Sequence, residues 1–128
     1  MSGAGQIRVL VIEAGEAGDS SARVATVEQS LEVFQGLVGG DIEGLTLTDE
    51  VSAYINETGK ARGLAVNTYA DALVRYLLHR SGRRLLPGDV IVGPVVFLGP
   101  PDSDGYDTDV PDDLIAFVRK LGVDIEED

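Results

Sequence analysis

The sequence predicts an α+β fold: a twisted, mostly antiparallel sheet with about three helices packed on one face. Short runs of β-branched and apolar residues indicate strands, and three stretches with apolar residues at helical spacing indicate helices. Along the chain, helices do not alternate regularly with single strands, which disfavours a doubly wound parallel sheet. The 128 residues fit one domain, 1–128, with a core over about 7–121 and an acidic tail at 122–128.

The first elements follow from local patterns. The run Ile7–Ile12 is β-branched and apolar, so it predicts a buried strand, and the Gly/Ser/Ala-rich residues 13–23 predict a loop. Thr26 and Gln29 resemble a capping box, which predicts a helix from about Thr26. Gly39-Gly40 ends that helix, because glycine tolerates the left-handed conformation there. The expected apolar face comprises Val27, Leu31, Phe34, Leu37 and Val38.

Two short strands come next: Ile42, Leu45 and Leu47 predict the first, over 42–47, and alternating apolar residues predict the second, over 51–55. Asn56–Gly59 predicts a tight turn with Gly59 at positive φ. Residues 62–66 fit either a further short strand or an extended lead into the next helix. Thr68 and Asp71 predict the start of that helix by a capping pattern.

The second helix is expected to present one apolar face and to end in a basic turn. His79 and Arg80 in its last turn suit the negative end of the helix dipole, and Gly82 closes it. Residues 89–99 predict one or two core strands around Gly93-Pro94. After an acidic loop over 100–111, Asp112 is expected to cap a final helix, and the tail is expected to fray. The face of the second helix comprises Tyr69, Ala70, Leu73, Val74, Tyr76, Leu77 and Leu78.

Composition excludes several classes of protein. The chain has no cysteine, so no disulfide, thiol nucleophile or thiolate metal site is expected. Its apolar runs are far shorter than the ~20 residues of a membrane helix, and the first residues do not resemble a secretory signal. We therefore expect a cytoplasmic protein without a membrane partner.

The charge is strongly acidic and unevenly distributed. A net charge of −12 argues against binding to duplex nucleic acid and is compatible with a cationic partner. Six basic residues and His79 lie between Lys60 and Arg84 beside one acid, whereas residues 102–128 hold ten acids. These segments can pair within the chain, pair across a homodimer or face partners.

Several candidate sites are better explained structurally. In residues 102–109, an EF-hand register would place Pro100 and Pro111 at essential ligand positions, so a solvated acidic loop is preferred to a cation site. The glycine stretches at 15–18 and 38–41 lack the helix N-terminus or lysine of a phosphate loop. His79 has arginines as neighbours and no partner for base catalysis. Glu13, Glu43 and Glu57 have no spacing that demands a metal site, and no cofactor or catalytic set is predicted.

One set of residues has the chemistry to bind a nucleotide-like anion. Arginines and tyrosines in and before the second helix combine positive charge with stacking surfaces. The alternative, which the acidic net charge favours, is that the tyrosines fill the core while the arginines are solvated or pair with the acidic third. The candidate ligand-binding residues are Arg62, Tyr69, Arg75, Tyr76 and Arg80.

The chain also resembles a known family. The motif segments are Val38-Gly39-Gly40-x-Ile42-Glu43, Asn56-Glu57-x-Gly59-Lys60, Asn67-x-x-Ala70, Gly88-Asp89-Val90-Ile91-Val92-Gly93 and Val95-Val96-Phe97-Leu98-Gly99. Together they resemble a family of small uncharacterised proteins carried by phages, plasmids and other mobile elements. The resemblance covers about residues 7–99 and implies an accessory protein, with no catalytic residues to transfer. Its recurring residues also have structural explanations: Gly39, Gly40 and Gly59 suit positive φ, while Asn56 and Asn67 suit a turn and a helix start.

The preferred hypothesis is a non-catalytic module that binds a host or self protein, because the charge is polarised and no catalytic set is assembled. The second hypothesis is a protein that binds a small, nucleotide-like anion. A metal-dependent hydrolase, resting only on abundant Asp and Glu, is the third.

Overall fold

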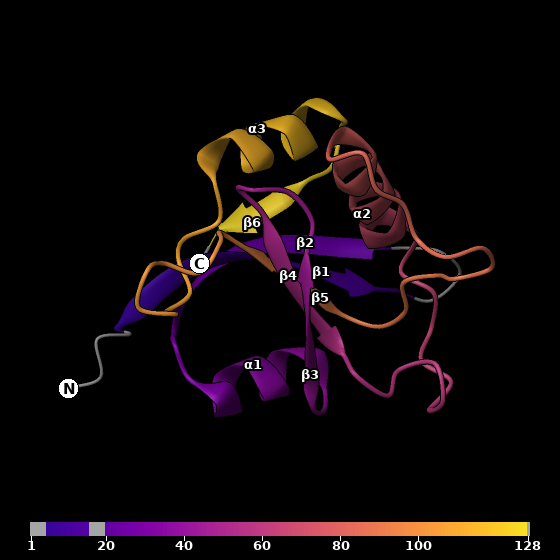
Figure 1. Cartoon of the computed structure of the whole chain (residues 1–128), viewed down its shortest axis with the longest axis horizontal. Helices are drawn as coiled ribbons and strands as arrows, with labels where there is room; N and C mark the ends of the chain where they lie inside the picture. The colour runs from indigo at the N-terminus through magenta and orange to yellow at the C-terminus, as the bar shows by residue number, and fades with distance from the viewer. Residues whose placement is uncertain (1–4, 16–19, 128) are drawn as a thin grey trace.

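The computed structural model describes residues 5–15 and 20–127, and its centre is a mixed sheet. The strands are β1 (Gln6–Ala14), β2 (Ser20–Glu28), β3 (Ile42–Thr46), β4 (Ser52–Asn56), β5 (Val95–Leu98) and β6 (Ile125–Glu127). They form a six-stranded sheet in the order β3-β4-β5-β1-β2-β6 (Figure 1). Neighbouring strands are antiparallel except β2 and β6, which are parallel. The predicted α+β class with a mostly antiparallel sheet is confirmed.

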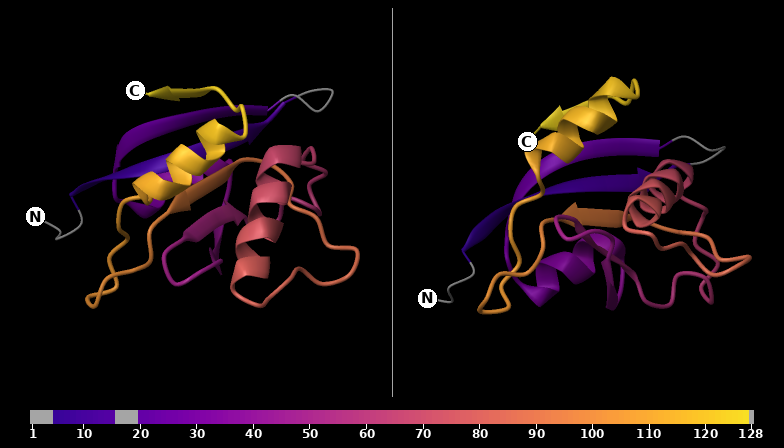
Figure 2. Two further views of the ribbon diagram at one scale, coloured as in Figure 1. Left: turned by 90° about the horizontal axis from the view of Figure 1, so that it is seen from above. Right: turned by 45° about the horizontal axis from the view of Figure 1, so that its top comes forward.

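Three helices pack against this sheet, and they cover both faces rather than one. Helix α1 (Leu31–Val38) lies on one face, while α2 (Thr68–Arg80) and α3 (Asp112–Lys120) lie on the other (Figures 1 and 2). The reason lies in β1 and β5, which are apolar on both sides. Leu10 and Phe97 pack in the α2–α3 cluster, whereas Val9 and Val96 pack in the α1 cluster. A strand that is apolar on both sides requires cover on each.

The predicted long loop and early helix are wrong over residues 20–28. This segment is β2, which pairs with β1 from Gln6↔Glu28 to Ala14↔Ser20. The helix begins only after Ser30, whose side chain accepts a hydrogen bond from the Val33 backbone N–H at 3.2 Å. Pairing along nine residues of β1 therefore prevails over the local capping pattern. The predicted helix end at Gly39 is confirmed, with φ of 81°.

The β3–β4 hairpin confirms the two predicted strands, but the glycines on either side of it, Gly40 and Gly59, do not serve the predicted purpose. Neither Gly40 nor Gly59 is among the glycines with positive φ. Instead, a Cβ on Gly59 would lie 2.9 Å from Val92 Cγ2, and one on Gly40 would lie 2.9 Å from Asn56 Nδ2. These two glycines are required by close approach of side chains, not by backbone conformation.

Residues 62–66 are neither a strand nor extended throughout: Arg62 and Gly63 lie in a turn, and the residues after them lead into α2, with Val66 in an isolated bridge to Val92. The N-cap is Asn67, not Thr68 as the Thr68/Asp71 pattern predicted. His79 and Arg80 occupy the last turn, and Gly82 with φ of 73° follows, as expected. Beyond α2, the segment 89–99 contributes one short strand, β5, which begins directly after Pro94.

The C-terminal part differs from its prediction in two ways. Pro111, without a side-chain hydrogen bond, is the N-cap of α3, and Asp112, expected as the cap, is the first helical residue and accepts a hydrogen bond from Arg8. The tail at 125–127 does not fray: it forms β6 beside β2, with Ala22 opposite Ile125. Asp128 and residues 16–18 of the 15–18 glycine stretch lie outside the described residues. No helix in the described parts of the chain is long and apolar enough to cross a membrane.

Candidate functional site

An apolar groove runs between α2 and α3 on the outside of the sheet's α2–α3 face. It has a volume of about 320 Å³, and we call it the α2–α3 groove. Three of its side chains are large, apolar and exposed: Tyr69 by 45%, Tyr76 by 39% and Leu121 by 60%. The residues that define it here are Tyr69, Leu73, Tyr76, Phe117, Leu121 and Val123.

The groove follows from helical spacing in two separate segments. Tyr69 and Tyr76 are seven residues apart in α2 and lie on the same side of that helix, while Phe117 and Leu121 are four residues apart at the end of α3. The rings of Tyr76 and Phe117 stack with centroids 4.8 Å apart and an interplanar angle of 13°. This contact joins the helices and leaves the outer edges of the groove open.

A second, polar cleft continues from one end of the groove. It measures about 460 Å³ and shares Tyr76 and Phe117 with the groove. We call it the acidic cleft, because Asp49, Glu50 and Asp113 line it against one guanidinium, that of Arg80.

Local structure fixes the position of these charges. Asp49 and Glu50 lie in the β3–β4 turn, where Thr48 Oγ1 accepts hydrogen bonds at 3.0 Å from the backbone N–H groups of Glu50 and Val51. Asp113 is in the first turn of α3. The Arg80 guanidinium lies over the Tyr76 ring, 5.9 Å from its centroid, which keeps that cation on the aromatic wall.

The five candidate anion-binding residues do not form one set. Tyr69, Tyr76 and Arg80 lie along the groove and the cleft. Arg75 instead donates to Asp71 Oδ2 at 2.8 Å and to the Asp89 carbonyl at 2.6 Å. Arg62 donates to the Gly39 carbonyl at 3.2 Å, near α1. One arginine therefore faces the tyrosines, and three carboxylates share its cleft.

The motif segments meet around Asn56, which is 4% exposed. Its side-chain amide donates to the Val38 carbonyl at 3.2 Å, and its oxygen accepts from the Thr58 backbone N–H at 2.9 Å. These bonds tie the end of α1 to the turn after β4, where Gly40 and Gly59 permit the close packing. The structure therefore gives these motif residues a role in packing the fold.

Glu43 and Glu57 are exposed near Asn56 and line a separate pocket of about 330 Å³. Its rim also carries the ion pair of Lys60 with Asp89. Glu13 does not join them: it lies on β1 with its carboxylate 3.7 Å from Arg23.

Metal-binding groups are not assembled in the described part of the chain. It contains no cluster of three or more His, Cys, Asp or Glu side chains placed to hold a metal ion. In the acidic loop, Asp102 Oδ1 accepts hydrogen bonds from the backbone N–H groups of Asp104 and Tyr106, so this carboxylate shapes the loop. His79 is exposed at the end of α2.

The sequence marked Asn67 as a helix start but did not reveal its second role. The side chain is fully buried, and its oxygen accepts from the Ala70 backbone N–H at 3.1 Å. Its amide donates to the carbonyls of Ile12 at 2.8 Å and Gly93 at 2.9 Å. Asn67 thus connects α2, which forms one wall of the groove, to β1 and to the turn before β5.

A half-buried polar contact that no sequence pattern indicated holds the acidic loop against β4. The Tyr54 hydroxyl donates to the Asp107 carboxylate, 3.0 Å from each oxygen. Burial, reinforced by this contact, raises the pKa of Tyr54 to about 12. Burial also raises the pKa of the Asp107 carboxyl, although the hydrogen bond from Tyr54 opposes that shift. Gln29 secures the same loop by accepting from the Asp107 backbone N–H at 2.6 Å.

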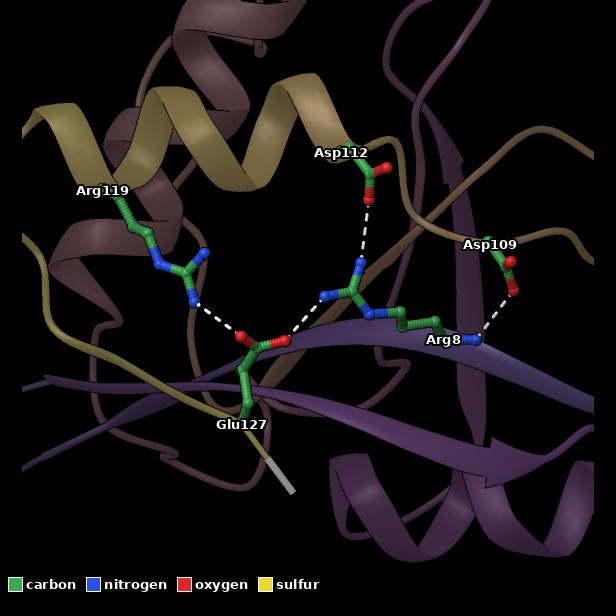
Figure 3. Close-up of polar contacts among 5 residues, drawn as sticks. All are labelled: Arg8, Asp109, Asp112, Arg119 and Glu127. Atoms are coloured by element: carbon green, nitrogen blue, oxygen red, sulfur yellow. Dashed lines mark hydrogen bonds and ion pairs between the residues drawn. The ribbon is translucent and has the colours of Figure 1, made fainter.

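Within the described residues, the acidic C-terminal third forms ion pairs with Arg8 of β1 and with Arg119, and none with the basic segment 60–84. Figure 3 shows the contacts of Arg8 and Arg119. Arg8 reaches Asp112 at 2.8 Å and Glu127 at 2.7 Å, and Arg119 reaches Glu127 at 3.1 Å. Hydrogen bonds from Arg8 and Arg119 hold the pKa of the Glu127 carboxyl below its usual value. This network joins β1, α3 and β6.

Fold and site together define a small α+β protein with an exposed apolar groove that opens into an acidic cleft. The chain belongs to DUF3846, a domain of unknown function, and the match covers residues 7–122. No curated protein and no solved structure matches the chain. The matched range includes both helices of the groove and stops before β6.

Proposed function

We propose that this chain is a non-catalytic binding module that engages another protein through the α2–α3 groove. The observation that carries the proposal is the concentration of Tyr69, Tyr76 and Leu121, all exposed, in one apolar groove. Contiguous exposed apolar surface is typical of protein interaction sites. Tyrosine is favoured at such sites because its ring contributes a large apolar area while its hydroxyl remains hydrated.

The biological setting we propose is that of an accessory protein of a phage or another mobile element, acting in the host cytoplasm on a host or self protein. The support for this setting is the resemblance of the motif segments around Asn56 to proteins of such elements. The net charge of −12 supports a protein partner over a duplex nucleic acid, because neutralising phosphates requires a basic surface.

The test is capture of partners from a lysate of the natural host with three tagged proteins: wild type, Leu121→Ser and Leu31→Ser. Leu31 is a matched control, since it is 58% exposed but lies on α1 on the other face of the sheet. We expect one partner to be captured by wild type and Leu31→Ser and lost with Leu121→Ser. Equal capture by Leu121→Ser, or no specific partner for the wild type, would contradict the proposal.

A further inference from the structure

We infer that the occupant of the α2–α3 groove is an amphipathic helix of a partner protein whose one end carries lysine or arginine and lies over the acidic cleft. This inference rests on the proposed function and adds the secondary structure, the charge and the direction of the bound segment. Two features carry it: the walls of the groove and the unpaired carboxylates of the acidic cleft at one end of it.

The walls favour a helix over an extended segment. Both are α-helices, whose backbone groups are largely satisfied by their own hydrogen bonds, so they present mainly side chains to an occupant. An extended peptide would leave its backbone groups without partners against Tyr69, Tyr76 and Leu121. A helix satisfies its own backbone and offers apolar side chains at spacings of three and four residues.

The charges favour a basic end. Within the described residues, the carboxylates of Asp49, Glu50 and Asp113 take part in no ion pair, in contrast to Asp112 and Glu127, which pair with Arg8. They outnumber Arg80, the one base that lines the cleft. Unpaired carboxylates next to an apolar groove are complementary to a segment that combines apolar and cationic side chains.

The direction follows from the order of residues along α3. Asp113 lies at its N-terminal end in the acidic cleft, Phe117 belongs to both cleft and groove, and Leu121 lies at the far end of the groove. A basic end of the occupant is therefore attracted to the Asp113 end of the groove.

Two labelled synthetic peptides, each as long as α2 at 13 residues, test the inference by fluorescence anisotropy. Both carry leucines at helical spacing, and they differ only in having lysines or glutamates at one end. We expect the lysine peptide to bind the wild-type chain, more weakly as salt rises, and the glutamate peptide to bind at least tenfold more weakly. Leu121→Ser should abolish binding of the lysine peptide, while Leu31→Ser should leave it unchanged.

Two triple variants distinguish the effect of the cleft carboxylates on peptide affinity from the effect of the protein's net charge. Replacing Asp49 and Asp113 with Asn and Glu50 with Gln should weaken the lysine peptide on the order of tenfold, since each exposed ion pair contributes modestly. A control triple changes exposed acids elsewhere by the same total charge and should have a much smaller effect. The control substitutions are Glu28→Gln, Glu32→Gln and Glu57→Gln.

Equal weakening by the two triples would overturn the inference, and so would tighter binding of the glutamate peptide. If the lysine peptide fails to bind while a host partner still depends on Leu121, the inference fails and the proposed function stands. A wild-type dimer in sedimentation that Leu121→Ser dissociates would identify a second copy as the occupant and would also overturn the inference. Loss of the Leu121 dependence in host capture would remove the proposed function itself.

Discussion

Asn67 connects the N-terminus of α2 to two backbone carbonyls, so replacing it with alanine is expected to destabilise the fold strongly. The substitution removes the donors to the Ile12 and Gly93 carbonyls and the acceptor for the Ala70 N–H, all within a fully buried site. A buried group that loses its partner costs about 1 kcal/mol or more, and loss of an N-cap costs about 1 kcal/mol. Asn67→Ala should therefore lower the free energy of unfolding by about 3 kcal/mol, a large share of the ~5–15 kcal/mol typical of a domain.

Urea unfolding followed by circular dichroism measures this loss, and Thr68→Ala is the matched control. Thr68 is the exposed residue at which the sequence pattern placed the helix start, so its replacement should change stability by no more than about 0.5 kcal/mol. The m-value should stay constant in both variants, because the surface exposed on unfolding is unchanged. A loss below about 1 kcal/mol for Asn67→Ala, or an equal loss for Thr68→Ala, would refute the reasoning.

The variant Asn67→Asp separates the two roles of the side chain. It keeps an acceptor for the Ala70 N–H but directs a carboxylate at the Ile12 and Gly93 carbonyls. Burial and these two acceptors should raise the pKa of the introduced carboxyl in the folded state. Its stability relative to wild type should therefore be highest at low pH, where the carboxyl is protonated and can donate, and should fall as pH rises through the folded-state pKa. A pH-independent difference from wild type would contradict this assignment.

Three further predictions concern packing and titration. Gly59→Ala should destabilise the fold by about 1–3 kcal/mol, because its Cβ would crowd Val92. Gly36→Ala in α1, with open space around it, should stabilise the fold by about 0.5–1 kcal/mol, and the midpoints of urea unfolding measure both effects. Because the pKa of Tyr54 is raised to about 12, its contribution to stability should be fully present below pH 10 and lost as pH rises towards 12, a loss that Tyr54→Phe should remove. Because the pKa of Glu127 is lowered, its contribution to stability should be present above the usual carboxyl pKa and lost as pH falls through the folded-state value. Glu127→Gln should reduce this loss of stability at acid pH, and an unchanged pH dependence would count against the Arg8 network.

Elements with a clear local period were predictable from the sequence. The apolar run Ile7–Ile12 became the core of β1, and the alternation in residues 51–55 became β4. β2 was not predictable in this way, because Thr26 and Gln29 form a capping pattern that is locally plausible. Only pairing with nine residues of β1 makes that segment a strand.

The candidate site was predictable in part. The spacing of Tyr69 and Tyr76 indicated a shared helix face, but the sequence did not show that this face stays partly open. That depends on how closely α3 approaches α2, and the two helices meet through a contact distant in sequence, the stacking of Tyr76 on Phe117. The hydrogen bonds that the Asn67 amide donates could not be predicted either, because their acceptors lie 55 and 26 residues away in the sequence.

The most direct test of the central claim is amide hydrogen exchange of the chain with and without the captured host partner. If the partner occupies the α2–α3 groove, amides of α2 and α3 should gain protection, and those of α1 on the other face should exchange at the same rate as in the free protein. Protection confined to α1 or to the edge strand β3, with α2 and α3 unchanged, would place the interface elsewhere and contradict the account.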